Sequence, residues 1–83
     1  MIITGTIKSK GMRKQSNETI MELGIYIDNY HGVQNVIIYQ NDLWKKLENV
    51  SLDDTVSLEV YNGKEENVLK LVATKVISIR KAT

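Results

Sequence analysis

The residues of this chain that could do chemistry are phenol rings and basic side chains. Tyr26, Tyr39 and Tyr61 each lie in a segment of alternating polar and apolar residues. A basic stretch precedes them, and its members are Lys8, Lys10, Arg13 and Lys14. Aromatic rings stack on nucleobases, at about 1–3 kcal/mol per base, and cations neutralise phosphates. These residue types favour contact with a single-stranded polynucleotide.

Groups that would support catalysis do not form a recognisable pattern in the sequence. The single histidine, His31, has no Ser, Cys or carboxylate at a suitable spacing, so we interpret it as a surface residue. Asp53 and Asp54 are interpreted as a turn before a strand, because no other acid or His is placed to complete a metal site with them. There is no Gly-rich phosphate loop. We therefore expect a protein that is not an enzyme and that uses no cofactor or metal.

The 83 residues are enough for one domain, residues 1–83, and 42% apolar residues are enough for one core. The sequence has no Cys, which excludes disulfides and thiolate metal sites and is compatible with a reducing cytoplasm, the location that we expect. No apolar run approaches the roughly 20 residues of a membrane span. The first residues lack the basic and long apolar segments of a signal peptide.

Charge is distributed unevenly, although the formal net charge is only +1. Residues 1–17 and 67–83 contain basic residues and no acid, while all 10 acids lie between them. Such segregation predicts one positive face, as phosphate contact would require. The alternative is that a small chain has segregated its charges by chance.

The elements that must position these side chains begin with two strands. Alternation predicts a first strand from Ile2 to Lys8, in which Gly5 permits tight coiling or a close crossing. Gly, Ser and Asn then predict a basic loop over Lys10–Gln15. A long second strand follows from Thr19 to Asn29, with Tyr26 on its non-core face. The residues expected on its core face are Met21, Leu23, Ile25 and Ile27.

A third strand, Val33 to Tyr39, follows a predicted hairpin turn at residues 29–32. Its inward face is ambiguous, because either Val36 and Ile38 or Ile37 and Tyr39 could point into the core. We choose Val36 and Ile38. This choice places three residues beside Tyr26 on the outer face, namely Asn35, Ile37 and Tyr39.

A short helix is predicted from Asp42 to Val50, with Asn41 as its N-cap. Its apolar residues form one stripe that would close the open bottom of a barrel. They are Leu43, Trp44, Leu47 and Val50. Trp44 is interpreted as a packing residue, with a ligand contact as the alternative.

Two further strands complete the pattern, Thr55 to Tyr61 and Val68 to Ile79, joined by a loop at 62–67 that contains Lys64. The fourth strand points Val56, Leu58 and Val60 inward and Tyr61 outward. In the fifth, Leu69, Leu71 and Ala73 alternate before the phase shifts to Val76 and Ile79, which predicts a bulge. Five strands with one helix between the third and fourth predict an all-β, five-stranded OB-fold barrel.

Three segments give the chain a resemblance to a known family. They are Val36-Ile37-Ile38-Tyr39, Leu52-Asp53-Asp54-Thr55-Val56-Ser57-Leu58-Glu59-Val60 and Leu71-Val72-Ala73-Thr74-Lys75-Val76. Over residues 2–80 the chain resembles the bacterial and phage single-stranded-DNA-binding proteins, including the related primosomal replication protein. The resemblance implies binding of single-stranded DNA without sequence specificity, in replication, recombination or repair. A phage or mobile-element origin fits the small size.

Two departures from this family limit what the resemblance implies. Its longer members end in an acidic tail that recruits partners, whereas this sequence ends in Arg80-Lys81-Ala82-Thr83, so we do not expect that recruiting role here. Family members also often stack bases on Trp or Phe, and the outer face predicted here carries Tyr instead.

The predicted nucleic-acid-binding residues are Lys8, Lys10, Arg13, Lys14, Tyr26, Asn35, Ile37, Tyr39, Tyr61 and Lys64. Single-stranded DNA is the expected ligand, with RNA as an alternative. In a second interpretation the chain is an OB-fold protein-interaction subunit of a replication or recombination complex, and its tyrosines contact a protein or a second copy in a homodimer or higher oligomer. A third, an RNA chaperone of the cold-shock type, is disfavoured because the chain has no Phe.

Overall fold

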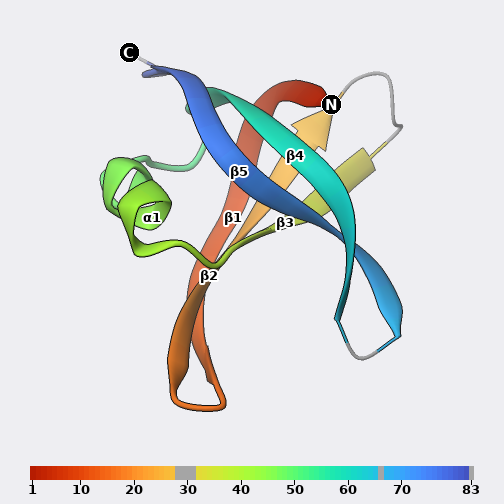
Figure 1. The fold of residues 1–83 in the computed structure, drawn as a ribbon. Coiled ribbons are helices and arrows are strands. Elements are labelled where there is room, and N and C mark those ends of the chain that lie inside the picture. Colours follow the sequence, from red (N-terminus) through yellow and green to blue (C-terminus); the bar gives the residue numbers. More distant parts are fainter. Residues whose placement is uncertain (28–31, 66, 83) are drawn as a thin grey trace.

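A computed structural model describes residues 1–27, 32–65 and 67–82 (Figure 1). The elements are β1 (Ile2–Gln15), β2 (Glu18–Ile27), β3 (Gly32–Ile38), α1 (Asn41–Leu47), β4 (Thr55–Glu65) and β5 (Val68–Arg80). Most of the hairpin turn predicted at 29–32 lies outside the described residues. No helix in the described ranges is long and apolar enough to cross a membrane.

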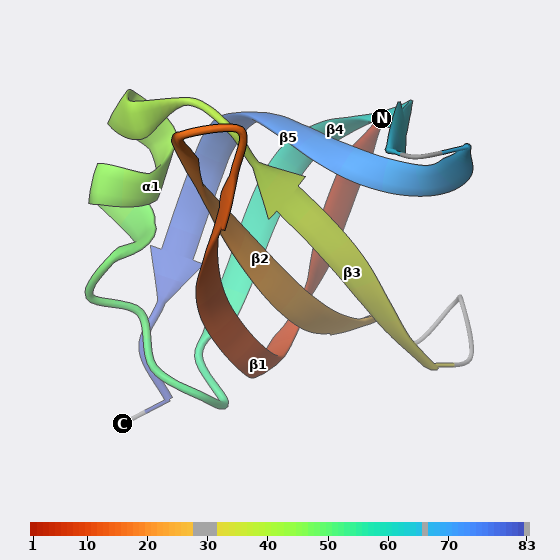
Figure 2. The ribbon, with the colours of Figure 1, turned by 90° about the horizontal axis from the view of Figure 1, so that it is seen from below.

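The five strands form a closed barrel in the order β1-β2-β3-β5-β4. Neighbouring strands are antiparallel, except that β3 runs parallel to β5, with Val36 beside Leu71 and Ile37 beside Val72. The short helix lies between β3 and β4 in the chain and beside one end of the barrel in space (Figure 2). This arrangement confirms the predicted fold class, a five-stranded barrel of the OB-fold type.

The core fills the barrel with the side chains that the alternation predicted for β2, β3 and β4. The inner residues of β2 are all buried, and the choice of Val36 and Ile38 as the inward residues of β3 is confirmed. Leu43, Leu47 and Val50 add apolar surface from the helix and the segment after it. Trp44 packs against this core with part of its ring buried, which confirms its packing role.

The predicted basic loop at Lys10–Gln15 is wrong, because these residues continue β1 as one arm of a long hairpin with β2. The hairpin reverses at Ser16 and Asn17, whose φ values of 50° and 69° match a two-residue type I′ turn. These residues project beyond the barrel and have no core to cover, so they form a strand through backbone hydrogen bonds alone. Backbone pairing does not require alternating apolar residues, and the sequence therefore shows no strand pattern here.

β1 pairs with β4 at its start and with β2 further along, and Gly5 lies where the two pairings meet and the strands approach closely. Residues 2–6 pair with β4, and the strand pairs with β2 from Thr6 onward. A Cβ at Gly5 would clash with the backbone carbonyl oxygen of Tyr26 and lie 2.7 Å from Cγ2 of Ile25. The expected close crossing is therefore confirmed. Just beyond it the register shifts between Ile7 and Ser9, which leaves Lys8 as an extra residue.

The predicted bulge in β5 is confirmed by two register shifts, between Ser57 and Leu58 and between Glu59 and Val60 of β4. Two of the inward positions predicted for β5 are wrong. Leu69 is 71% exposed, because β4 continues to Glu65 and β5 begins at Val68, so that Leu69 lies in a hairpin that extends beyond the barrel. Ile79 is also exposed, near the other end of β5.

The helix differs from its prediction at both ends. It ends at Leu47 rather than Val50, and its N-cap position is Gln40, without a side-chain capping bond. Asn41 instead accepts a hydrogen bond at Oδ1 from Nε1 of Trp44, at 2.8 Å. This bond fixes the orientation of the indole ring relative to the first turn of α1.

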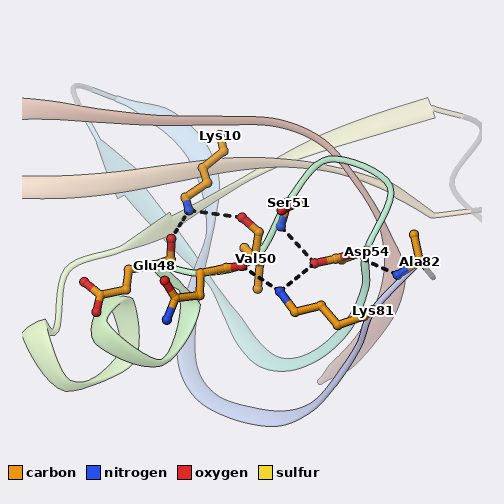
Figure 3. A network of polar contacts seen from close by, with 8 residues as sticks. Lys10, Glu48, Val50, Ser51, Asp54, Lys81 and Ala82 are labelled. Atoms are coloured by element: carbon orange, nitrogen blue, oxygen red, sulfur yellow. Dashed lines mark hydrogen bonds and ion pairs between the residues drawn. The ribbon is translucent and has the colours of Figure 1, made fainter.

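Two lysines and one buried carboxylate hold the segment after the helix in place (Figure 3). Lys10 donates from Nζ to the carbonyl oxygens of Glu48 and Val50, and Lys81 donates to that of Asn49 at 2.6 Å. Cations at these carbonyls stabilise the negative end of the helix. β1 and the residues after β5 are thereby both tied to the end of α1.

Candidate nucleic-acid interface

The outer faces of β2, β3 and β5 form a surface that we call the outer strip. Across it, Glu22 of β2 lies beside Ile37 of β3, Ile37 beside Val72 of β5, and Val72 beside Tyr61 of β4. Tyr26 lies toward one end of this strip, beside Val33. The strip is where the sequence placed its candidate residues on β2 and β3.

The three candidate phenol rings are each partly exposed but are spread over the surface. Tyr26 is 40% exposed, Tyr39 37% and Tyr61 52%. Tyr26 pairs with Val33, and Tyr39 lies six residues further along the chain, so at about 3.3 Å per residue the two are roughly 20 Å apart. Tyr26 and Tyr39 therefore cannot stack on neighbouring bases, although each can contact a different part of a bound strand.

Two hollows that share Asn35 form what we call the central groove. One, of about 280 Å³, extends from Asn35 to Ser9 and Arg13 of β1. The other, of about 380 Å³, extends from Asn35 to Leu69 and Lys70 of β5. The groove thus lies between the β1–β2 hairpin and the β4–β5 hairpin, which both extend beyond the barrel toward the lower part of Figure 1. Asn35 lies at its centre, as a binding role would require.

A glycine lets the strands come close beside Asn35. Gly24 of β2 lies between Ser9 and Asn35 in the register. A Cβ at Gly24 would clash with the Ser9 hydroxyl and lie 3.0 Å from Cγ1 of Val33. Sequence reasoning missed this position, although a glycine inside a strand is a signal of close approach.

Glu22 accepts two ion pairs at the centre of the outer strip. Its carboxylate lies 3.1 Å from Nε of Arg13 and 3.7 Å from Nζ of Lys70. Because β3 lies between β2 and β5, the contact with Lys70 must cross β3. Two cations from different strands thus share one carboxylate at the centre of the outer strip. Lys70 was not among the predicted site residues, and its sequence neighbours gave no signal for this role.

The prediction that Ile37 lines an accessible surface is wrong. Ile37 does point outward, yet it is 0% exposed. It lies between Glu22 and Val72 in the register, under the part of the strip that the Glu22–Lys70 ion pair crosses. Its burial depends on contacts between residues far apart in the sequence. Ile37 is therefore buried beneath the side chains of the outer strip and cannot contact a ligand directly.

Five of the basic residues bind acids or backbone carbonyls of the described chain, namely Lys8, Lys10, Arg13, Lys70 and Lys81. Lys8 pairs with Asp53 at 3.1 Å, and Lys81 pairs with Asp54 at 3.1 Å. Lys10 binds the carbonyls after α1, on the side of the hairpin away from Arg13. The separation of charges along the sequence therefore produces ion pairs between distant segments. Lys8 and Lys10 do not line up with Arg13 in a single phosphate-binding row.

Two predicted cations remain available for a ligand. Lys14 and Lys64 are exposed and form no ion pair with the described residues. Lys64 lies in the β4–β5 hairpin, two residues after Asn62, which lines the central groove. Lys14 pairs with Thr19 near the tip of the β1–β2 hairpin. Each hairpin thus carries an ammonium group that has no ion-pair partner in the part of the chain that the structure describes.

No group of three or more His, Asp or Glu side chains in the described ranges is arranged to hold a metal ion. Searches against protein-family models, curated proteins and solved structures found no match to the chain.

Proposed function

We propose that this protein binds single-stranded nucleic acid, most favourably single-stranded DNA, without sequence specificity. The observation that supports this best is the central groove, which crosses the outer strip of an OB-type barrel between two projecting hairpins. Barrels of this type bind oligonucleotides on the same side, between the corresponding loops. The ligand would replace water over a surface that combines exposed rings with cations.

In this proposal the aromatic rings hold bases and the cations hold the backbone. Tyr26 and Tyr61 offer their exposed rings for stacking, which tolerates any base. Arg13 and Lys70 lie on either side of Glu22, and Lys64 adds an exposed cation from the second hairpin. Asn35 can both donate and accept hydrogen bonds at the centre of the groove.

Fluorescence anisotropy of a labelled oligo-dT at low salt tests this function. We expect Tyr26→Ala and Tyr61→Ala each to weaken binding about 5- to 150-fold, the equivalent of one lost stacking contact. Tyr26→Phe and Tyr61→Phe keep the ring and should bind within about twofold of wild type. An oligo-U of equal length decides between DNA and RNA. Wild-type protein that fails to bind either oligonucleotide would rule out the proposal.

One observation favours the rival function, an interaction module for proteins. β3 and β5 pair over two residues each and then separate toward the start of β3 (Figure 2). The hollow between them is lined by Val33, Val68 and Leu69, which are all more than half exposed. An extended peptide could add to either strand edge there. Absence of oligonucleotide binding, together with binding of a partner that Leu69→Lys abolishes, would favour this function.

A further inference from the structure

A third hollow lies between the tip of the β1–β2 hairpin and the segment that follows β3. We call it the hairpin cleft. It has a volume of about 590 Å³, within the range of roughly 300–1,000 Å³ that is usual for small-molecule sites. Asn17 and Glu18 line it from the hairpin, and Tyr39, Gln40 and Trp44 line it from the opposite side.

The chemistry of the hairpin cleft differs from that of the central groove. Its described lining combines two aromatic residues, three residues with side-chain amides and one acidic residue, Glu18, and contains neither Lys nor Arg. The indole of Trp44 is held by its bond to Asn41 and by packing against the core, so the ring is already oriented before a ligand arrives. Such a lining suits an uncharged planar ring with polar edges and disfavours a phosphate.

A cation lies just outside this lining. Lys14 pairs with Thr19, which lines the cleft, and paired side chains of antiparallel strands have Cβ atoms about 4.5–5.5 Å apart. Lys14 is exposed and has no ion-pair partner among the described residues. The cleft therefore offers amide groups and one acidic residue in its lining and a positive charge near its rim, which complements a nucleotide whose base is inserted and whose phosphate stays outside.

We propose that the hairpin cleft binds one nucleobase of the bound strand and prefers bases with an exocyclic amino group. This inference rests on the proposed function and extends it. The carboxylate of Glu18 only accepts hydrogen bonds, so it can bind the amino group of cytosine or adenine, which thymine lacks. The amides of Asn17 and Gln40 can both donate and accept, and therefore serve the remaining edge of the base.

The position of Tyr39 explains how one nucleic-acid strand could reach both the outer strip and the hairpin cleft. Tyr39 follows β3 directly and also lines the hairpin cleft. A strand that leaves the outer strip past Tyr39 meets the cleft next, with Lys14 near its phosphate. One position of an otherwise unselective binder would then carry a base preference.

Trp44 is the single tryptophan of the chain, so tryptophan fluorescence reports specifically on the hairpin cleft. Oligo-dC and oligo-dT of equal length are titrated into the full-length protein, with anisotropy reporting total binding and Trp44 emission reporting the cleft. We expect oligo-dC to quench Trp44 and to bind about fivefold more tightly than oligo-dT, as one added hydrogen bond implies. Glu18→Gln should reduce this preference to within about twofold. Glu59→Gln, an exposed change on the far part of β4, should leave it intact.

The outcomes separate the two proposals. Equal binding of both oligonucleotides with unchanged Trp44 emission would overturn the cleft inference and leave the proposed function standing. If neither oligonucleotide changes the anisotropy, the proposed function fails, and free cytidine and thymidine are titrated against Trp44 emission instead. Quenching by cytidine at concentrations where thymidine has no effect supports the cleft as a base site. No quenching by either nucleoside overturns it.

Discussion

Asp54 is the buried charged residue of the described chain, and its contacts explain why it tolerates burial. Its carboxylate accepts hydrogen bonds from the backbone N–H groups of Ser51, at 2.8 Å, and Ala82, at 3.0 Å, and from Nζ of Lys81, at 3.1 Å (Figure 3). The bonds from Ser51 and Ala82, followed by Lys81, lower the pKa of this carboxyl below its usual 3.8 despite desolvation.

This lowered pKa predicts the pH dependence of stability. Because the folded protein binds a proton at Asp54 less readily than the unfolded chain, the contribution of Asp54 is complete above the unfolded pKa and is lost as pH falls through the lower folded value. We expect the urea midpoint to fall as the pH is lowered below about 4, and to fall less steeply in Asp54→Asn. The control Glu59→Gln should follow wild type. Parallel curves for wild type and Asp54→Asn would contradict this role.

Two cations on one face of the β1–β2 hairpin, Lys10 and Lys14, are expected to have different roles. Lys10 binds the carbonyls after α1, whereas Lys14 has no such partner among the described residues. Lys10→Met should lower the free energy of unfolding by about 1 kcal/mol and leave oligonucleotide affinity within about twofold. Lys14→Met should do the reverse, with unchanged stability and weaker binding. Urea denaturation and anisotropy on both variants decide this, and equal effects of the two on binding would refute the division.

At the scale of elements, strand β1 contains two glycines, of which one is closely packed and the other is open to solvent. A side chain at Gly5 would strike the backbone of β2, while at Gly11 nothing lies within 4 Å of the new Cβ. Gly5→Ala should therefore destabilise the protein by about 1–3 kcal/mol, and Gly11→Ala should change its stability by less than about 0.5 kcal/mol. Thermal unfolding of both variants measures the difference. Similar melting temperatures would show that β1 does not curl tightly at Gly5.

The inner faces of the elements could be predicted from the sequence, whereas features set by distant contacts could not. Alternation in β2 and β4 identified the core residues, because one face of each strand must be buried. Ile37 is buried beneath the ion pair between Glu22 and Lys70, and no local sequence pattern predicts that ion pair. The hairpin over Lys10–Gln15 escaped prediction because backbone pairing outside the barrel places no demand on side chains.

The same reasoning applies to the candidate site. Tyr26, Asn35 and Tyr61 were placed on the surface by alternation alone, and they do lie there. The hairpin cleft could not be predicted, because the β1–β2 hairpin and the start of α1 meet only in the folded chain. The uneven distribution of charge along the sequence corresponds in part to ion pairs between distant segments, which the sequence alone could not show.

At the scale of the whole molecule, the ion pairs limit how strongly salt can affect binding. Lys14 and Lys64 have no ion-pair partner among the described residues, and Arg13 and Lys70 share the carboxylate of Glu22, which a phosphate could replace as their partner. At about 0.7 per phosphate contact on single strands, three or four contacts predict a slope of log K against log salt between about −2 and −3. If all eight basic residues near the two ends of the sequence bound phosphates, the slope would be roughly −5.6. Anisotropy titrations over a series of NaCl concentrations measure the slope, and a value steeper than about −5 would contradict the ion-pair assignment.

The brief parallel contact between β3 and β5 has a consequence for how the barrel assembles. Val36 and Ile37 meet partners some 35 positions later in the chain, and the start of β1 meets β4 from still further away, whereas β1–β2, β2–β3 and β4–β5 join segments that follow one another in the chain. Local pairings form early because short loops cost little entropy to close. The chain is thus expected to form a three-stranded meander of β1, β2 and β3 and a two-stranded ribbon of β4 and β5. These two units would then associate in the rate-limiting step.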